Sequence, residues 1–238
     1  MKTLTYLTFI GAVAFILLVL LLKLDVIPIM NEVPPQAGQA RPTLIIDPGH
    51  GGEDGGAVAA DGTLESELNL QISNKLELIA AFFGADVIKT RDGQDIVYPD
   101  SAKTVKARKT ADQRARLELI SSHPDAVLIS VHQNKYISQS PKGAQVFYAK
   151  TEGSKELAEK AQELLRALPD GASERIAMPV SEDVYIMKNA PCTAVLAECG
   201  FISNPNELAM LKSDEHQTIL AAVLAAAYLS TCIRTEAF

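Results

Sequence analysis

The chain contains only three cysteines in 238 residues, and this scarcity argues against a fold stabilised by disulfides. An odd number of cysteines cannot close into a complete disulfide framework, and Cys192, Cys199 and Cys232 form no CxxC pair. We therefore expect buried thiols, and a bridge between Cys192 and Cys199 is the remaining alternative.

The chain also lacks a cluster of basic residues. It has 22 lysines and arginines against 29 aspartates and glutamates, and its formal net charge is -7. Nucleic-acid binding depends largely on lysine and arginine side chains that neutralise phosphates. The composition therefore excludes nucleic acid as an expected partner.

Two common catalytic arrangements are missing as well. The sequence has no GxxxxGK[ST] loop, which would hold a nucleotide phosphate, and no serine or cysteine placed as a nucleophile beside a base. The chemistry must then rest on a small set of acids and histidines, and the chain holds only four histidines.

One long apolar run stands at the N-terminus. Residues 3–22 are uncharged over the roughly 20 residues needed to cross a bilayer. The run is long for a cleaved signal, and the nearest small-x-small site lies well beyond it at residues 38–40, so we favour an uncleaved anchor over a removed signal peptide. We expect residues 1–25 to form this segment, residues 26–42 a proline-rich linker, and residues 43–238 one catalytic domain. This domain would be exported, and either anchored on the outer face of the cytoplasmic membrane or secreted.

His50 follows a short buried strand. Residues 43–47 are mostly apolar or β-branched, and the run ends in Pro48 and several glycines, which indicates a strand that feeds a tight loop. In open α/β sheets ligands bind at the carboxyl ends of the strands. We expect His50 to lie there and to donate a hydrogen bond to Asp47. A histidine in a glycine-rich turn that binds no ligand is the alternative.

A helix is predicted from Glu65 to Phe83. Glu65 shares a helix face with the apolar residues Leu68 and Ile72, whereas Glu67 lies on a polar face. This spacing predicts that Glu65, and not Glu67, points inward. The alternative is that Glu65 only complements the helix dipole.

Two later strands deliver polar residues in the same way. Residues 126–132 form an apolar run that ends in His132, and residues 193–198 form one that ends in Glu198. An apolar strand has no structural need for a terminal glutamate. We therefore expect Glu198 at the same edge as His132, and an exposed turn carboxylate is the alternative.

Periodicity and turn residues predict the remaining elements. We expect strands at residues 85–90, 143–148 and 184–187, and helices at residues 104–122, 154–168 and 214–232 with a further one starting at Asn204-Pro205. His123 and His216 lie away from the strand ends, and we expect both to be ordinary surface residues.

His50, Glu65 and His132 match the ligand set of a catalytic zinc site. Three protein ligands leave one position open for water, and zinc lowers the pKa of that water to about 7 and polarises a carbonyl. Glu198 would act beside the metal as general base and then as general acid. These residues fit the metal-assisted hydrolysis of an amide.

Five motifs resemble those of the zinc-dependent N-acetylmuramoyl-L-alanine amidases of the amidase_3 family. They are Asp47-Pro-Gly-His-Gly-Gly52, Glu65 before Leu68-Asn69-Leu70, Thr90-Arg91 with Asp95, Ser130-Val-His-Gln-Asn134, and Glu198-Cys-Gly-Phe-Ile-Ser-Asn204. The resemblance implies a single α/β domain with a mostly parallel six-stranded sheet flanked by helices. It also implies Zn²⁺ on His50, Glu65 and His132, and Glu198 as the catalytic carboxylate. The implied reaction cleaves the amide between the lactyl group of N-acetylmuramic acid and L-alanine in peptidoglycan.

Within that family, the chain is most similar to the germination-specific CwlD-type amidases of spore formers, which prepare muramic δ-lactam in the spore cortex. The similarity rests on the compact length, the single apolar segment and residues 142–148 and 184–188. Gln133 and Cys199 depart from the residues usual at their positions, and the autoinhibitory helix of cell-division members has no obvious counterpart. The implied partners are peptidoglycan and the cytoplasmic membrane, and an activating protein is a further candidate partner.

Two other functions compete with this one. A zinc carboxypeptidase acting on wall peptides uses a similar ligand set, but it would need an arginine for the terminal carboxylate, and we expect no arginine beside a ligand motif. A noncatalytic peptidoglycan-binding protein could keep the fold. The intact set of His50, Glu65, His132 and Glu198 argues against this second alternative.

Overall fold

The computed structural model describes residues 41–168 and 174–231. The predicted N-terminal anchor and nearly all of the predicted linker lie outside these residues. Within the described ranges, no helix is both long enough and apolar enough to span a membrane. The described chain forms an α/β domain with a mostly parallel six-stranded sheet, so the predicted class of the folded part is confirmed.

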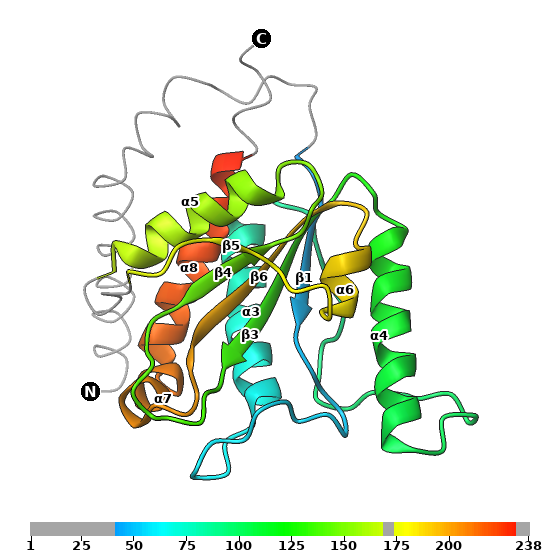
Figure 1. The fold of residues 1–238 in the computed structure, drawn as a ribbon. Coiled ribbons are helices and arrows are strands. Elements are labelled where there is room, and N and C mark those ends of the chain that lie inside the picture. The colour runs from blue at the N-terminus through cyan, green and yellow to red at the C-terminus, as the bar shows by residue number, and fades with distance from the viewer. Residues whose placement is uncertain (1–40, 169–173, 232–238) are drawn as a thin grey trace, which may run out of the picture. The chain divides into compact units, whose positions relative to one another are not determined.

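The sheet has the strand order β2-β1-β3-β6-β4-β5. The strands are β1 (Leu44–Pro48), β2 (Val87–Lys89), β3 (Val127–Asn134), β4 (Gln145–Tyr148), β5 (Met178–Pro179) and β6 (Thr193–Phe201). Strands β2, β1, β3 and β6 are parallel to one another, whereas β4 is antiparallel to β6 and parallel to β5. The four parallel strands therefore end at one edge of the sheet (Figure 1).

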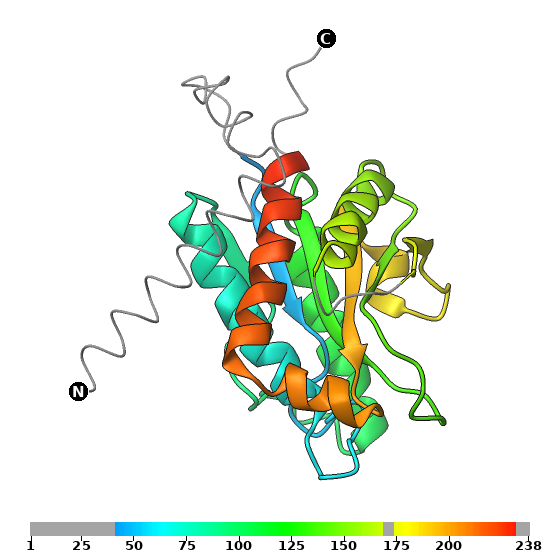
Figure 2. The same cartoon turned by 90° about the vertical axis from the view of Figure 1, so that its left-hand side faces the viewer.

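Helices cover both faces of this sheet. They are α3 (Glu65–Phe82), α4 (Val105–Ser121), α5 (Ser154–Arg166), α6 (Tyr185–Asn189), α7 (Pro205–Leu211) and α8 (Asp214–Thr231). Helix α8 packs between α3 and α5 on one face, and α4 contacts α6 on the other (Figures 1 and 2). The parallel strands are thus sandwiched between helices, as continuous apolar strands require.

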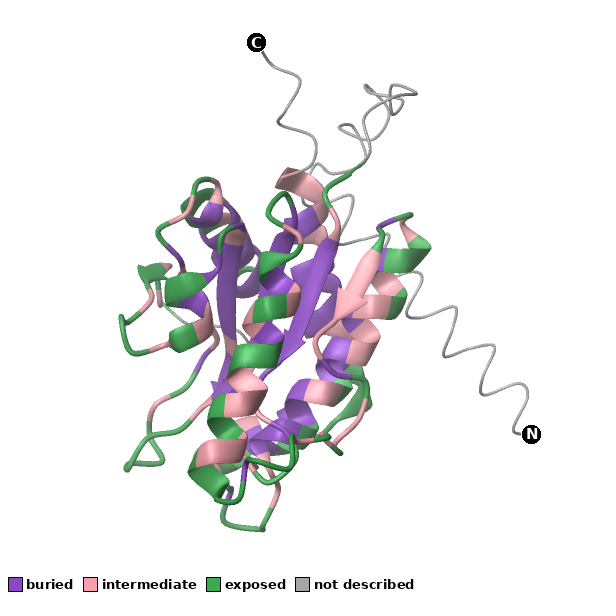
Figure 3. Cartoon of the chain, turned by 90° about the vertical axis from the view of Figure 1, so that its right-hand side faces the viewer, coloured by how far each residue is buried: buried purple, intermediate pink, exposed green. Residues whose placement is uncertain are grey.

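The core lies on both sides of β1 and β3. Leu44, Ile45 and Ile46 are fully buried, and Figure 3 shows the buried residues gathered on the central strands and on the inner faces of the helices. Helix α8 is buried nearly all round, as its apolar sequence predicts, and the hydroxyl of Tyr228 donates a hydrogen bond to the carbonyl of Pro42 over 2.6 Å. This packing fixes the strands whose ends carry the site.

The predicted strand at residues 184–187 is wrong, because α6 occupies this stretch. The amide of Lys188 donates to the carbonyl of Val184, and the amide of Ala190 to that of Ile186, so the backbone is helical. Met187 packs into the core beneath the helix. A short apolar run does not distinguish a strand from a single helical turn.

Strands β3 and β6 run further than the sequence predicts. Strand β3 continues past His132 to Asn134 with an irregular register, and β6 continues past Glu198 to Phe201. Cys192 and Cys199 are buried free thiols, which confirms the expected thiols and contradicts a bridge between them.

Candidate metal centre

Three elements bring His50, Glu65 and His132 together at the carboxyl edge of the sheet. His50 lies two residues after β1, Glu65 is the first residue of α3, and His132 lies near the end of β3. Their ligand atoms all lie within 4.8 Å of one another. The structure therefore places the three predicted ligands in one cluster.

Glu65 stands at the centre of this cluster. Its Oε1 atom lies 2.9 Å from Nδ1 of His132 and 3.3 Å from Nε2 of His50. Oε1 also accepts a hydrogen bond from the amide of Gln133, and Oε2 accepts one from the amide of Ala57. Burial opposes ionisation, but the hydrogen bonds from both imidazoles hold the pKa of Glu65 well below its usual range. Both oxygens of the carboxylate are thus fixed.

The position of Glu65 agrees with the inward helix face that the sequence predicts for it. Glu65 is only 4% exposed, whereas Glu67 is an exposed residue. Asn69, one turn later, donates hydrogen bonds to Glu65 Oε1 over 3.4 Å and to the carbonyl of Gly49 over 3.0 Å. The first turn of α3 therefore aims one carboxylate at the cluster and the other at solvent.

The His50 imidazole is held from both sides. Nδ1 lies 2.9 Å from Oδ2 of Asp54, while Nε2 faces Glu65. Burial would lower the pKa of His50, but the hydrogen bonds to Asp54 and Glu65 raise it to about 9. The prediction that Asp47 receives the hydrogen bond from His50 is wrong, because Asp54 takes that role.

Asp47 instead ties β1 to its neighbours. It is 1% exposed and accepts hydrogen bonds from Thr90, Ser130 and Arg116 over 2.6, 2.7 and 3.0 Å. Burial would raise the pKa of Asp47, but Arg116 and the two hydroxyl groups hold it below its ordinary value. Asp47 is therefore an ionised structural anchor beneath the His50 loop.

Two buried arginines support the same loop, and the sequence predicted neither role. Arg91 donates to the carbonyls of Pro48, Gly49 and Ser66, and Arg116 donates to those of Pro48 and His50. The expectation that no arginine lies beside a ligand motif is wrong. Arg116 belongs to the charged helix α4, and its ion pairs with Asp47 and Asp112 accompany its burial.

Close packing requires glycine at position 49. A Cβ atom built on Gly49 would lie 2.2 Å from Nε2 of His132, far inside van der Waals contact. His50 itself has a φ of 60°, in the left-handed region that non-glycine residues rarely adopt. The glycine-rich turn thus lets the backbone pass directly against the second histidine.

Glu198 lies beside the cluster without belonging to it. It pairs in register with His132 across β3 and β6. Its Oε2 atom is buried and has no hydrogen-bond partner among the described residues, and burial raises the pKa of Glu198 to about 7. A carboxyl group with this pKa can take up and release a proton near neutral pH.

Neighbouring residues give no sign of a second reactive group. Burial raises the pKa of the Cys199 thiol to about 12, so this cysteine is inert. His123 is hydrogen-bonded to Ser122 and to the carbonyl of Leu119 at the end of α4, away from the strand ends, as the sequence predicts.

A cleft of about 180 Å³ opens from the cluster over the face that carries α4 and α6. Its charged members include Asp54, Lys109, Asp112 and Asp183, and Tyr185 lies at the start of α6. Lys109 lies 2.8 Å from Asp54, so a charged surface continues outward from His50. The cleft gives a substrate access to the cluster.

This fold and this site define a class of protein. Two histidines and a carboxylate that could hold a metal lie at the carboxyl edge of a parallel sheet, and a second, protonatable carboxylate lies next to them. Such a constellation is typical of hydrolases that use a metal ion.

Comparison with known proteins identifies the family. The Amidase_3 model, described as N-acetylmuramoyl-L-alanine amidase, matches residues 44–228, and the chain belongs to this family. The germination-specific N-acetylmuramoyl-L-alanine amidase of Bacillus subtilis is 33% identical over 180 residues, which cover 75% of each chain. The amidase AmiC of Escherichia coli is 35% identical over 128 residues, which cover 53% of this chain and 28% of that one.

Solved structures agree with this assignment. The CwlD amidase from Clostridioides difficile, determined in complex with the GerS lipoprotein, superposes with a TM-score of 0.76 and 34% identity, covering 80% of this chain and 100% of that chain. The chain is therefore an N-acetylmuramoyl-L-alanine amidase, an enzyme of peptidoglycan cleavage. The alternatives of a carboxypeptidase and of a noncatalytic binding protein find no support in these comparisons.

Proposed function

We propose that the chain hydrolyses the amide between N-acetylmuramic acid and L-alanine with a zinc ion held by His50, Glu65 and His132. The observation that carries this proposal is the convergence of the three side chains within 4.8 Å, with the unpartnered oxygen of Glu198 beside them. The roles of the four residues are those that the sequence predicts.

The donor set fits zinc on two grounds. Two imidazoles and one carboxylate are ligands that zinc takes at catalytic sites. The surrounding groups also favour a cation, since the Glu65 carboxylate lies between the two imidazoles and the Asp54 carboxylate lies behind His50. Asp54 would fix the ring orientation, as carboxylates behind metal-bound histidines do.

Zinc, when bound, would supply a Lewis acid that polarises the substrate carbonyl and lowers the pKa of water. Glu198 would then accept a proton from the attacking water on Oε2, which has no other partner. The same carboxyl group would return that proton to the departing amine of L-alanine. Its raised pKa makes both steps accessible near neutral pH.

The test compares Glu198→Ala with His50→Ala. We expect Glu198→Ala to keep zinc and to lose about 10²- to 10⁴-fold in turnover, as is typical of a lost general acid and base. We expect His50→Ala to lose zinc as well. Metal content is measured together with peptidoglycan hydrolysis, and Glu159→Ala on the outer face of α5 is the control. A zinc-bound Glu198→Ala enzyme with normal turnover would sink the mechanism.

We further propose that the enzyme acts outside the cytoplasmic membrane on the spore cortex. Support comes from the apolar run at residues 3–22 and from the 33% identity to a germination-specific amidase. A protein partner is proposed as well, because a relative of 34% identity was solved with a lipoprotein. Mass spectrometry of cortex fragments from cells with and without the gene would test the cortex role, since muramic δ-lactam should disappear in its absence.

A further inference from the structure

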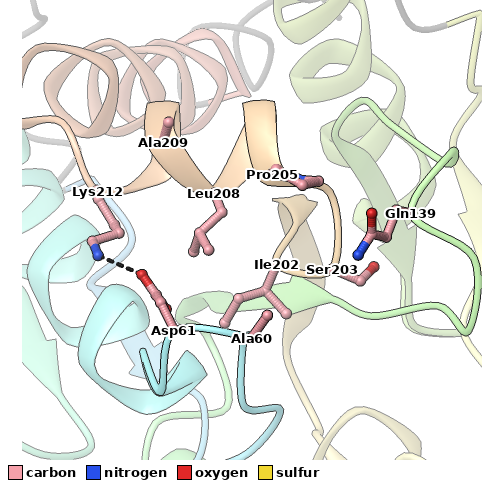
Figure 4. Close-up of a pocket in the computed structure, with 9 residues that line it drawn as sticks. All are labelled: Ala60, Asp61, Gln139, Ile202, Ser203, Pro205, Leu208, Ala209 and Lys212. Carbon is pink, nitrogen blue, oxygen red and sulfur yellow. Dashed lines mark hydrogen bonds and ion pairs between the residues drawn. The ribbon is translucent and has the colours of Figure 1, made fainter.

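A second hollow lies at the same edge of the sheet as the metal centre, on the side of α7. It has a volume of about 460 Å³. Ile202 and Leu208 form its buried apolar floor, and the exposed residues Ala60 and Ala209 stand on opposite walls (Figure 4). We call it the α7 groove.

The α7 groove is continuous in the chain with the metal centre. Ala60 lies on the loop that joins His50 to Glu65, and Gln139 lies on the segment that follows β3 and His132. Ile202 follows directly after β6, the strand of Glu198. Each wall therefore extends a segment that carries a site residue, and the groove lies with the metal centre at the carboxyl edge of the sheet.

The groove and the cleft beside α4 differ in charge. Asp61 and Lys212 are the charged residues lining the groove, and they neutralise each other in an ion pair of 2.7 Å. The cleft on the opposite face instead carries Lys109, Asp112 and Asp183. The two hollows thus offer one surface without net charge and one mainly acidic surface on either side of the site.

The substrate has the same asymmetry about its scissile amide. On one side are N-acetylated sugars, which carry hydroxyl and acetamido groups and no charge after the lactyl carboxyl is amidated. On the other side is a stem peptide that carries ionised carboxylate and amino groups. An apolar hollow accommodates acetamido methyl groups and the apolar faces of sugar rings, whereas ionised groups require polar partners.

An exposed aromatic residue borders the groove. Tyr136 is 59% exposed, and its amide donates a hydrogen bond to Oγ of Ser203, a residue of the groove wall, over 3.1 Å. An aromatic ring combines a large apolar surface with a polar tip. The backbone of Tyr136 therefore lies next to the groove wall, and an exposed ring of this kind suits contact with a sugar.

We propose that the α7 groove binds the glycan strand of peptidoglycan on the muramic acid side of the scissile amide. The stem peptide lies over the opposite face, in the cleft between α4 and α6. The inference rests on the proposed function for its substrate, and it assigns the two arms of that substrate to the two hollows.

The test fills the groove from its exposed walls. Ala209→Trp on α7 and Ala60→Trp on the facing loop introduce indole groups without removing a core side chain. Ala81→Trp is the matched control, because Ala81 is also an exposed helical alanine but lies at the opposite end of α3. Thermal unfolding of each variant verifies the fold.

Binding is measured first with glycan strands from which all stem peptides have been removed. We expect each groove variant to bind them about tenfold more weakly than the wild type, and Ala81→Trp to bind them equally well. This readout needs no turnover. Equal binding by wild type and both groove variants would overturn the glycan assignment.

Hydrolysis gives the second readout, with one stem peptide on either a long glycan or a single muramic acid. The groove variants should raise KM about tenfold for the long glycan and change it less than about twofold for the short substrate. An equal rise in KM for both substrates would place their shared stem peptide in the groove and overturn the proposal. If the groove variants weaken glycan binding but the wild type cleaves neither substrate, the proposed function is contradicted and the glycan assignment stands.

Discussion

Asp54 holds the His50 ring on the side away from Glu65, and it also pairs with Lys109 and accepts a hydrogen bond from the amide of Gly56. Removing such a carboxylate typically costs 10- to 100-fold in metal affinity. We expect Asp54→Ala to weaken zinc binding by about that factor while folding is retained. Asp61→Ala, an aspartate of the same loop that pairs with Lys212, is the control. Unchanged zinc affinity in Asp54→Ala, measured by competition with a chelator, would show that the ring needs no such support.

Glu65 and Glu67 are two residues apart and face opposite surroundings. Glu65 receives hydrogen bonds from both sides of the cluster, whereas Glu67 is exposed. We expect Glu65→Gln to lose zinc and Glu67→Gln to retain it, since an amide is a far poorer zinc ligand than a carboxylate. Equal retention in both purified variants would contradict the assignment.

The positions of the candidate site residues could be predicted because these residues lie in local patterns. Strand ends and helix faces follow from spacing over a few positions, and they locate His132, Glu198 and Glu65. Arg116 could not be predicted in the same way, because its carboxylate partner Asp47 lies 69 positions earlier. A charged residue on a charged helix looks solvated until the strand beside it is known.

At the scale of elements, Arg116 joins α4 to β1 through a buried ion pair with Asp47 and a hydrogen bond to the carbonyl of Pro48. Asp47 and Arg116 are 1% and 4% exposed, and removing Asp47 leaves the buried Arg116 charge with Asp112 as its remaining carboxylate partner. We expect Asp47→Asn to lower the free energy of unfolding at pH 7 by about 3 kcal/mol. Denaturant unfolding measures this loss, and Asp125→Asn, in the turn before β3, is the control.

The same pair predicts a pH dependence. The pKa of Asp47 is lower in the folded protein than in the unfolded chain, so its contribution is fully present above about pH 4 and is lost as the pH falls through the folded value. The stability difference between wild type and Asp47→Asn should therefore shrink on acidification below pH 4. A difference that is constant down to pH 2 would show that the carboxylate is not ionised in the fold.

Elements were predicted with unequal success for a physical reason. The long helices and buried strands have enough residues to show a period, and their expected positions agree with α3, α4, α5, α8, β1, β3 and β6. Residues 184–187 are too few to separate a strand from a helical turn, and the two residues of β5 carry no pattern at all. Tertiary packing decides both cases.

At the scale of the whole molecule, the apolar run at residues 3–22 predicts how the protein is distributed in cells. We expect the intact protein in the membrane fraction, released by detergent and not by high salt, because the run has a bilayer-spanning length. Deletion of residues 1–25 should move the protein to the soluble fraction. Recovery of the full-length gene product only as a soluble species that begins near residues 25–40 would identify a cleaved signal.

The strand order has a consequence for the time at which the enzyme becomes active. Leu44 pairs with Val127, and Val127 pairs with Thr193, so each contact that builds the site joins distant parts of the chain. Parallel pairings of this kind close large loops and form slowly. A nascent chain that has not yet delivered β6 holds His50, Glu65 and His132 but lacks Glu198. With the role proposed for Glu198, we expect wall-cleaving activity only after nearly the whole domain has been synthesised and has folded.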